Sequence, residues 1–229
     1  MNRINQLLAA SLLAAVSLSA QAAFVYQNDF EANANGVSGA GGRASSEGFS
    51  AFGFGQQYFR NAAGGNPATS SVLTFNLAGA ATGVTLGFDL AVLDSWDGAN
   101  CCGPDFFNVK VDGTSIYSKN FSIFDGVATG SELLALVYGQ GLAASGSWAD
   151  AGYSLSFSLG NLAAGAHTIE FFASGNVWQA GDDESFAIDN LKVQARSIDQ
   201  GNNVPEPESY GLVALALAGL ALTTRRRAR

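Results

Sequence analysis

Val84-Thr-Leu-Gly-Phe-Asp-Leu-Ala-Val92 places an apolar side chain at every second position. Successive side chains of a β-strand point to opposite faces of the sheet, so the five apolar residues of this stretch share one face. Thr85 and Asp89 lie on the other face. The stretch therefore predicts a β-strand that packs one face against a core and leaves the other more polar.

The same period of two recurs along the chain and predicts an all-β fold. Further apolar stripes of this kind are Leu73–Leu77, Phe107–Val111, Tyr153–Phe157, His167–Phe171 and Phe186–Ala195. Phe24–Phe30 is typical of a first strand, and Asp112-Gly113 is a two-residue hairpin signal. Seven or more half-buried strands with intervening loops favour an antiparallel β-sandwich of jelly-roll type.

Three segments carry weaker signals. Glu31–Gly48 is rich in Gly, Ala, Asn and Ser, which predicts a long loop. Phe49–Arg60 is aromatic and Gly-rich, which indicates a strand pair or an irregular edge. Ser131–Tyr138 is the one segment with a weakly helical pattern.

The N-terminal segment, residues 1–22, predicts a secretory signal peptide. Arg3 supplies a positive start, Leu7–Leu18 is apolar, and Ala20-Gln21-Ala22 offers small residues for cleavage. The predicted sandwich then occupies residues 23–203. These 181 residues are one domain by length and can bury a sizeable core.

The tail, residues 204–229, has three zones. Val-Pro-Glu-Pro forms an extended entry, because proline fixes φ and removes a backbone donor. The thirteen uncharged residues Tyr210–Leu222 would span roughly 20 Å as a helix, short of the ~30 Å hydrocarbon core. The basic end consists of Arg225, Arg226, Arg227 and Arg229. It stays on the cytoplasmic side by the positive-inside rule, so the domain faces outward.

This tail resembles the PEP-CTERM sorting signal of Gram-negative bacteria in its entry, apolar helix, basic cluster and terminal position. The resemblance implies that Pro205, Glu206 and Pro207 are recognised by an exosortase. It implies transient insertion in the inner membrane, delivery to the cell envelope or the outside, and an association with exopolysaccharide and biofilm. The alternative is a simple membrane anchor, which does not require a Pro-Glu-Pro entry.

The charge balance excludes a nucleic-acid partner. The whole chain carries a formal charge of −8, from 11 basic and 19 acidic residues. Without Arg3 and the tail arginines 6 basic residues remain, and without Glu206 and Glu208 17 acidic ones remain, so the domain is near −11. Nucleic-acid binding requires basic patches, whereas this domain offers many carboxylates to divalent cations.

Two acidic clusters predict a calcium site. Their members are Asp94, Asp97 and Asp105 in the first, and Asp182, Asp183, Glu184 and Asp189 in the second. Ca²⁺ takes six to eight oxygen ligands, which carboxylates, carbonyls and water supply. The alternative is that these side chains cap loops and turns or form a solvated acidic surface.

The second cluster also carries a change of phase. Phe186 and Ile188 occupy even positions, whereas Leu191 and Val193 occupy odd ones. The inward face therefore shifts at Asp189-Asn190, which predicts a β-bulge. Either a cation or backbone amides hold one of these two side chains inward.

The phrases Asp94-Ser-Trp-Asp-Gly and Asp183-Glu-Ser-Phe-Ala-Ile-Asp-Asn-Leu191 resemble segments of secreted jelly-roll, carbohydrate-binding-like domains. The resemblance implies a structural calcium between an N-terminal strand and the last strand. The matching candidates in this chain are Asp29 or Glu31 together with Asp189.

Trp96, Trp148 and Trp178 lie in predicted loops or loop edges. An exposed Trp stacks on the apolar face of a sugar ring, whereas a partly buried Trp seals the end of a sandwich. The cysteines, Cys101 and Cys102, are adjacent, with Cα atoms ~3.8 Å apart, below the usual disulfide range. A vicinal disulfide, two free thiols and an intermolecular link are the alternatives.

Catalytic signals are weak. His167 is the only histidine and lies on an apolar stripe, no Gly-x-Ser-x-Gly elbow surrounds a serine, and no set of zinc ligands can be assembled. Spacing alone identifies no carboxylate pair for glycoside cleavage. We therefore expect a non-enzymatic, exported envelope or matrix protein. A calcium-stabilised carbohydrate-binding module is the first alternative, and a polysaccharide hydrolase or lyase is the second.

Overall fold

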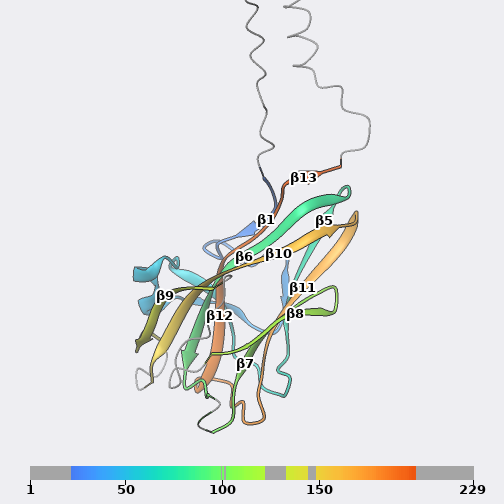
Figure 1. The fold of residues 1–229 in the computed structure, drawn as a ribbon. Helices are drawn as coiled ribbons and strands as arrows, with labels where there is room; N and C mark the ends of the chain where they lie inside the picture. Colours follow the sequence, from blue (N-terminus) through green and yellow to red (C-terminus); the bar gives the residue numbers. More distant parts are fainter. Residues whose placement is uncertain (1–21, 99, 101, 122–132, 144–147, 200–229) are drawn as a thin grey trace, which may run out of the picture.

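The computed structural model describes residues 22–98, 100, 102–121, 133–143 and 148–199, which form two antiparallel β-sheets (Figure 1). The larger sheet has the order β3-β4-β12-β6-β10-β9, with β1 paired to β12 and β13 to β6. The smaller sheet has the order β2-β5-β11-β7-β8. The predicted all-β, antiparallel architecture is confirmed. The predicted signal peptide and C-terminal helix lie outside the described residues.

The strands of the larger sheet are β1 (Ala23–Asn28), β3 (Gly42–Ser45), β4 (Gln57–Asn61), β6 (Ala81–Asp94), β9 (Leu133–Gln140), β10 (Asp150–Leu162), β12 (Glu184–Ala195) and β13 (Ser197–Ile198). Those of the smaller sheet are β2 (Val37–Gly39), β5 (Ser71–Leu77), β7 (Phe106–Val111), β8 (Thr114–Asn120) and β11 (Gly165–Ser174). One 3₁₀ helix, η1 (Glu47–Phe52), precedes β4. No helix in the part of the chain that the structure describes is long and apolar enough to cross a membrane.

The core lies between the two sheets, where β6 presents the face that its alternation predicts. All five apolar residues from Val84 to Val92 are buried in it. Phe88 meets the smaller sheet, with ring centroids 5.1 Å from Phe171 and 6.0 Å from Phe107. This apolar contact is the main force that holds the layers together.

A second apolar cluster covers part of the outer face of the larger sheet. Phe49 of η1 and Phe54 pack there with Tyr58 against Ala91 and Ala187. Toward the N-terminal half of β6 the same face carries the polar Asp89 instead. The outer face of the larger sheet is therefore covered at one end and open at the other.

The predicted hairpin and bulge are both present. Asp112 and Gly113 have φ values of 48° and 76° between β7 and β8, as a two-residue hairpin turn requires. The pairing of β12 with β6 shifts register between Asp189 and Lys192. Asn190 lies at this bulge with φ 50°.

Two predictions about weaker segments were wrong. The predicted helical segment 131–138 contains the start of β9, an edge strand hydrogen-bonded to β10, because pairing with a neighbour outweighs local propensity. The predicted loop 31–48 contains β2 and β3, which pair with β5 and β4. The segment 49–60, predicted as a strand pair or an irregular edge, contains the end of η1 and most of β4.

Candidate functional site

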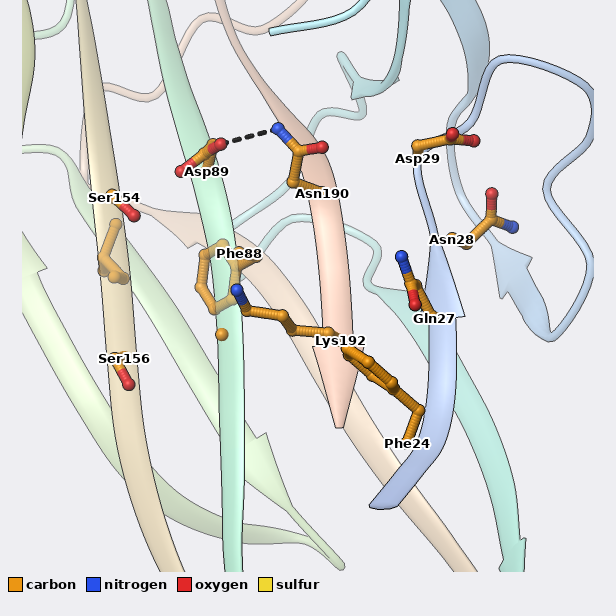
Figure 2. Close-up of a pocket in the computed structure, with 12 residues that line it drawn as sticks. Phe24, Gln27, Asn28, Asp29, Phe88, Asp89, Ser154, Ser156, Asn190 and Lys192 are labelled. Atoms are coloured by element: carbon orange, nitrogen blue, oxygen red, sulfur yellow. Dashed lines mark hydrogen bonds between the residues drawn. The ribbon is translucent and has the colours of Figure 1, made fainter. Parts of the chain in front are cut away.

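A polar groove lies on the open part of the larger sheet's outer face (Figure 2). It has a volume of about 410 Å³. We call it the outer-face groove and define it by Phe24 of β1, Gly87 and Asp89 of β6, Ser154 and Ser156 of β10, and Lys192 of β12. Gly87 of β6 and Ser154 and Ser156 of β10 have small side chains on this face, so a hollow remains between their larger neighbours.

Lys192 and Phe24 form one side of the outer-face groove. The side chain of Lys192 lies across β6, where a Cβ atom at Gly87 would come within 2.9 Å of Lys192 Cε (Figure 2). Phe24 is 55% exposed, although an aromatic ring of this size is normally buried. An apolar surface and a cation therefore stand beside each other at the rim.

Asp89 and Asn190 form a hydrogen-bonded pair in the groove (Figure 2). Asn190 Nδ2 donates to Asp89 Oδ2 at 2.7 Å and to the carbonyl of Gly53 at 3.1 Å. The bulge of β12 places the amide there. The second oxygen of Asp89 and the amide oxygen of Asn190 leave acceptors for a hydroxyl-bearing ligand.

A more open hollow of about 480 Å³ adjoins the groove and shares Gln27, Asn28 and Asp29 with it. Asn33 and Asn35 line its other part. The pair of hollows is lined mainly by amides, hydroxyls and carboxylates, which suits a neutral polar ligand. Sequence reasoning named only Asp29 of this surface as a candidate. The sequence does contain a signal for this surface: Gly87, Ser154 and Ser156 alternate with the apolar core residues of their strands.

A buried carboxylate cluster lies at the end of the sandwich where β6 ends and β12 begins. Asp97, Asp105 and Glu184 each place an oxygen within 4.8 Å of the other two. Asp97 and Asp105 lie in the loop between β6 and β7, and Glu184 begins β12. Asp97 N donates to Asp105 Oδ2 at 2.7 Å, and Gln179 N donates to Glu184 Oε2 at 2.6 Å.

Burial raises the pKa of all three carboxyls in this cluster. Asp183 adds to the effect at Asp97, and Asp105 and Glu184 repel each other as anions. When one of them is protonated, Asp105 and Glu184 are hydrogen-bonded to each other. The cluster therefore favours a bound positive charge, whether a proton or a cation.

The other calcium candidates lie outside this cluster and have different surroundings. Asp182 is exposed and pairs with Arg60 at 3.1 Å, and Asp183 Oδ1 accepts from Ser95 Oγ at 3.2 Å. Asp94 is buried at the end of β6, and its N–H donates to Asp150 Oδ1 at 2.8 Å. Sequence reasoning did not single out Asp150, which is fully buried and binds backbone amides.

Backbone amides bind carboxylate oxygens of the calcium candidates predicted between the first and last strands. Asp189 Oδ2 accepts from Gly55 N, and Asp189 Oδ1 accepts from Asn190 N, both at 2.7 Å. Glu31 Oε1 accepts from Gln56 N at 2.6 Å, and Asp29 Oδ1 accepts from Glu31 N at 3.2 Å. The sequence predicts that either a cation or backbone amides hold Asp189 or Asn190 inward. In the structure, backbone amides bind both oxygens of Asp189.

Trp96 and Trp178 lie together at the end of the sandwich, whereas Trp148 lies at the surface. Trp96 is fully buried, donates from Nε1 to the Ser185 carbonyl at 2.8 Å, and packs edge-on against Trp178 at 5.0 Å. Of the two predicted alternatives, Trp96 seals the end of the sandwich. The prediction that Trp96 stacks on a sugar is wrong, because its ring is fully buried. Trp178 is half-buried, whereas Trp148 is 44% exposed.

Cys102 is disulfide-bonded. Its predicted partner, Cys101, lies outside the described residues, so the vicinal pairing stays a prediction.

Comparison with known proteins identifies the tail. Residues 203–227 match the PEP-CTERM protein-sorting motif. The chain carries a PEP-CTERM sorting signal. This motif marks proteins that are exported and anchored at the cell envelope through exosortase processing, in agreement with the predicted export. The individual roles of Pro205, Glu206, Pro207 and the arginine cluster of the PEP-CTERM tail stay predictions.

Solved structures similar to this chain include three carbohydrate-binding modules. The CBM22-1 xylan-binding domain from Paenibacillus barcinonensis Xyn10C has 7% identity and a TM-score of 0.37, covering 77% of this chain and 96% of that one. A family 35 module from an environmental isolate has 15% identity and a TM-score of 0.38, with 77% and 93% covered. TmCBM61, solved with β-1,4-galactotriose, has 12% identity and a TM-score of 0.40, with 75% and 97% covered. No curated protein matches the chain.

Proposed function

We propose that the mature domain is a non-catalytic component of the cell envelope or extracellular matrix that binds polysaccharide in the outer-face groove. The observation that carries the proposal is the combination of Phe24, Lys192 and the Asp89–Asn190 pair around a floor of Gly87 and small serines. Export to the cell envelope by the PEP-CTERM signal supports this proposal. The association of such signals with exopolysaccharide makes a biofilm matrix polymer the expected ligand.

The chemistry of the groove suits a sugar. A pyranose ring presents hydroxyls at its edge and C–H groups on its face. Carboxylate, amide and ammonium groups bind the hydroxyls, and an exposed ring such as that of Phe24 covers the C–H face. Ser154 and Ser156 lie two residues apart on β10, a spacing of about 6.8 Å along the strand. They offer repeated hydroxyl contacts to an extended chain.

Binding of the purified exported protein to envelope and matrix polysaccharides, by affinity electrophoresis, tests the proposal. Gly87→Val fills the floor at a position whose nearest neighbour is the flexible end of Lys192, so the fold is retained. Its matched control, Ser118→Val, adds the same side chain to an exposed position on β8. Lys192→Ala is paired in the same way with Lys119→Ala.

We expect at least about tenfold weaker binding for Gly87→Val and Lys192→Ala, or about 1.4 kcal/mol, with both controls unchanged. Equal affinity of all four variants and the native protein would place the ligand elsewhere. Release of new reducing ends from the polysaccharide over time would contradict the non-catalytic role.

A further inference from the structure

The buried carboxylate cluster is assembled from two distant parts of the chain. Asp97 and Asp105 belong to the β6–β7 loop, whereas Glu184 begins β12. The exposed fractions of the three residues are 6%, 0% and 0%. Three acidic side chains at this depth carry a large desolvation cost unless a positive group accompanies them.

When Asp105 and Glu184 are both ionised, one oxygen of each carboxylate has no hydrogen-bond donor. Asp105 Oδ1 and Glu184 Oε1 are buried and accept no hydrogen bond from the described residues, while the second oxygen of each carboxylate binds a backbone amide. Within the described ranges, ion pairs form only between Arg60 and Asp182 and between His167 and Asp112. A single proton between Asp105 and Glu184 neutralises only one of the three charges.

The surroundings hold these oxygens in place. Asn120 Nδ2 donates to the carbonyls of Asp97 at 2.9 Å and Asp105 at 2.7 Å, which ties the two ends of the loop together. A Cβ atom on the buried Gly175 would collide with Asp105 Oδ1. The absence of a side chain at Gly175 therefore allows Asp105 Oδ1 to lie at this position.

We propose that Asp97, Asp105 and Glu184 bind a calcium ion that joins the β6–β7 loop to the start of β12. The three donors are oxygens without a histidine or thiolate, which favours a hard cation over zinc. Oxygens on opposite sides of Ca²⁺ are about 4.6–5.2 Å apart, and the donors lie within 4.8 Å of one another. Water and carbonyl oxygens complete the coordination.

This ion acts on stability and is independent of glycan binding in the outer-face groove. It neutralises charge between two segments that otherwise repel, so Ca²⁺ binds the folded state and stabilises it by mass action. We expect saturating Ca²⁺ to raise the Tm of the exported protein by roughly 5 °C or more relative to EDTA.

Three variants distinguish calcium binding at this cluster from a general effect of acidic residues on Tm. Glu184→Gln and Asp105→Asn keep side-chain size and resemble the protonated state, so both fold in EDTA but lose the Ca²⁺-dependent rise in Tm. Asp182→Asn, two residues from Glu184 but exposed, keeps it in full. A Glu184→Gln protein that retains the rise, or a native protein whose Tm is equal in EDTA and Ca²⁺, overturns the proposal.

Terbium luminescence gives a readout that does not depend on any variant. Tb³⁺ replaces Ca²⁺ and emits when a nearby indole is excited. Trp96 precedes Asp97 in the chain and packs against Trp178. We expect saturable, tryptophan-sensitised emission that Ca²⁺ displaces at micromolar to millimolar concentration. Absence of such emission from the native exported protein would refute the site even if the variants failed to fold.

Discussion

Gly55 donates its backbone N–H to Asp189 Oδ2 at 2.7 Å, across 134 positions of the sequence. The bond connects the segment that covers the outer face of the larger sheet to the bulge in β12. Burial raises the pKa of Asp189 to about 6, and the amides of Gly55 and Asn190 limit the rise. The carboxylate thus holds the covering segment at the border of the outer-face groove.

Gly55→Ala will weaken this junction. The added Cβ atom would collide with Glu31 Oε1, which accepts from the amides of Gln56 and Gln57. We expect the free energy of unfolding to fall by about 1 kcal/mol, because displacing the exposed Glu31 side chain breaks these hydrogen bonds. Urea denaturation measures it. Gly42→Ala, where a Cβ meets nothing within 4 Å, serves as the control, and an equal effect of both substitutions would contradict the argument.

Trp96→Phe will destabilise the end of the sandwich. The substitution removes the N–H that binds the Ser185 carbonyl and leaves a buried acceptor without its donor. We expect a loss of about 1–3 kcal/mol in the free energy of unfolding. Trp148→Phe, at an exposed position, should cost less than about 1 kcal/mol. Equal denaturation midpoints for the two variants would refute the structural role of Trp96.

His167 will titrate above its ordinary pKa. Its Nδ1 lies 2.7 Å from Asp112 Oδ2. Although burial lowers the pKa of His167, the hydrogen bonds to Asp112 and the Ala163 carbonyl raise it above 6.5 overall. Because the folded pKa of His167 exceeds the unfolded one, the contribution of His167 to stability is complete below pH 6.5 and is lost as pH rises through the folded pKa. Although burial raises the pKa of Asp112, its hydrogen bonds to His167 and Thr168 lower it overall, so the contribution of Asp112 is lost as pH falls through its folded pKa.

The imidazole NMR signal of the only histidine measures this pKa without assignment. Asp112→Asn suits the hairpin's left-handed backbone and removes the charge, so we expect the pKa of His167 to fall. Asp182→Asn is the control and should leave the pKa of His167 unchanged. A pKa that is the same in Asp112→Asn as in the native protein would show that the pair makes no electrostatic contribution.

Removal of the basic tail can be read from intact mass. Because PEP-CTERM signals are processed by an exosortase, protein recovered from outside the cell should lack the arginine cluster. Replacing Pro205 and Pro207 by Ala removes two residues of the predicted recognition element and should leave the tail attached. Glu208→Ala, just beyond the Pro-Glu-Pro triplet, should be processed normally. Native protein with Arg229 still in place would contradict this prediction.

Much of the fold follows from local patterns. The alternation from Val84 to Val92 predicts which side chains enter the core, and Asp112-Gly113 predicts the hairpin between β7 and β8. The change of phase at Asp189-Asn190 predicts the bulge. These features depend on side-chain direction and backbone φ over a few residues, so the residues themselves specify them.

The features that the sequence leaves open depend on contacts between distant segments. The strand β9 forms because β10 offers hydrogen-bond partners, and β2 and β3 likewise pair with β5 and β4. The conformational preference of a short segment does not depend on which distant strand it pairs with.

The sorting signal and the acidic residues differ in the same way. The PEP-CTERM signal is read from contiguous residues, so the sequence alone identifies it. Among the predicted acidic residues, only the tertiary fold joins Glu184 to Asp97 and Asp105 and gives Asp189 to the amides of Gly55 and Asn190. Strand pairing determines these distances, because β12 lies beside β6 although about ninety residues separate them.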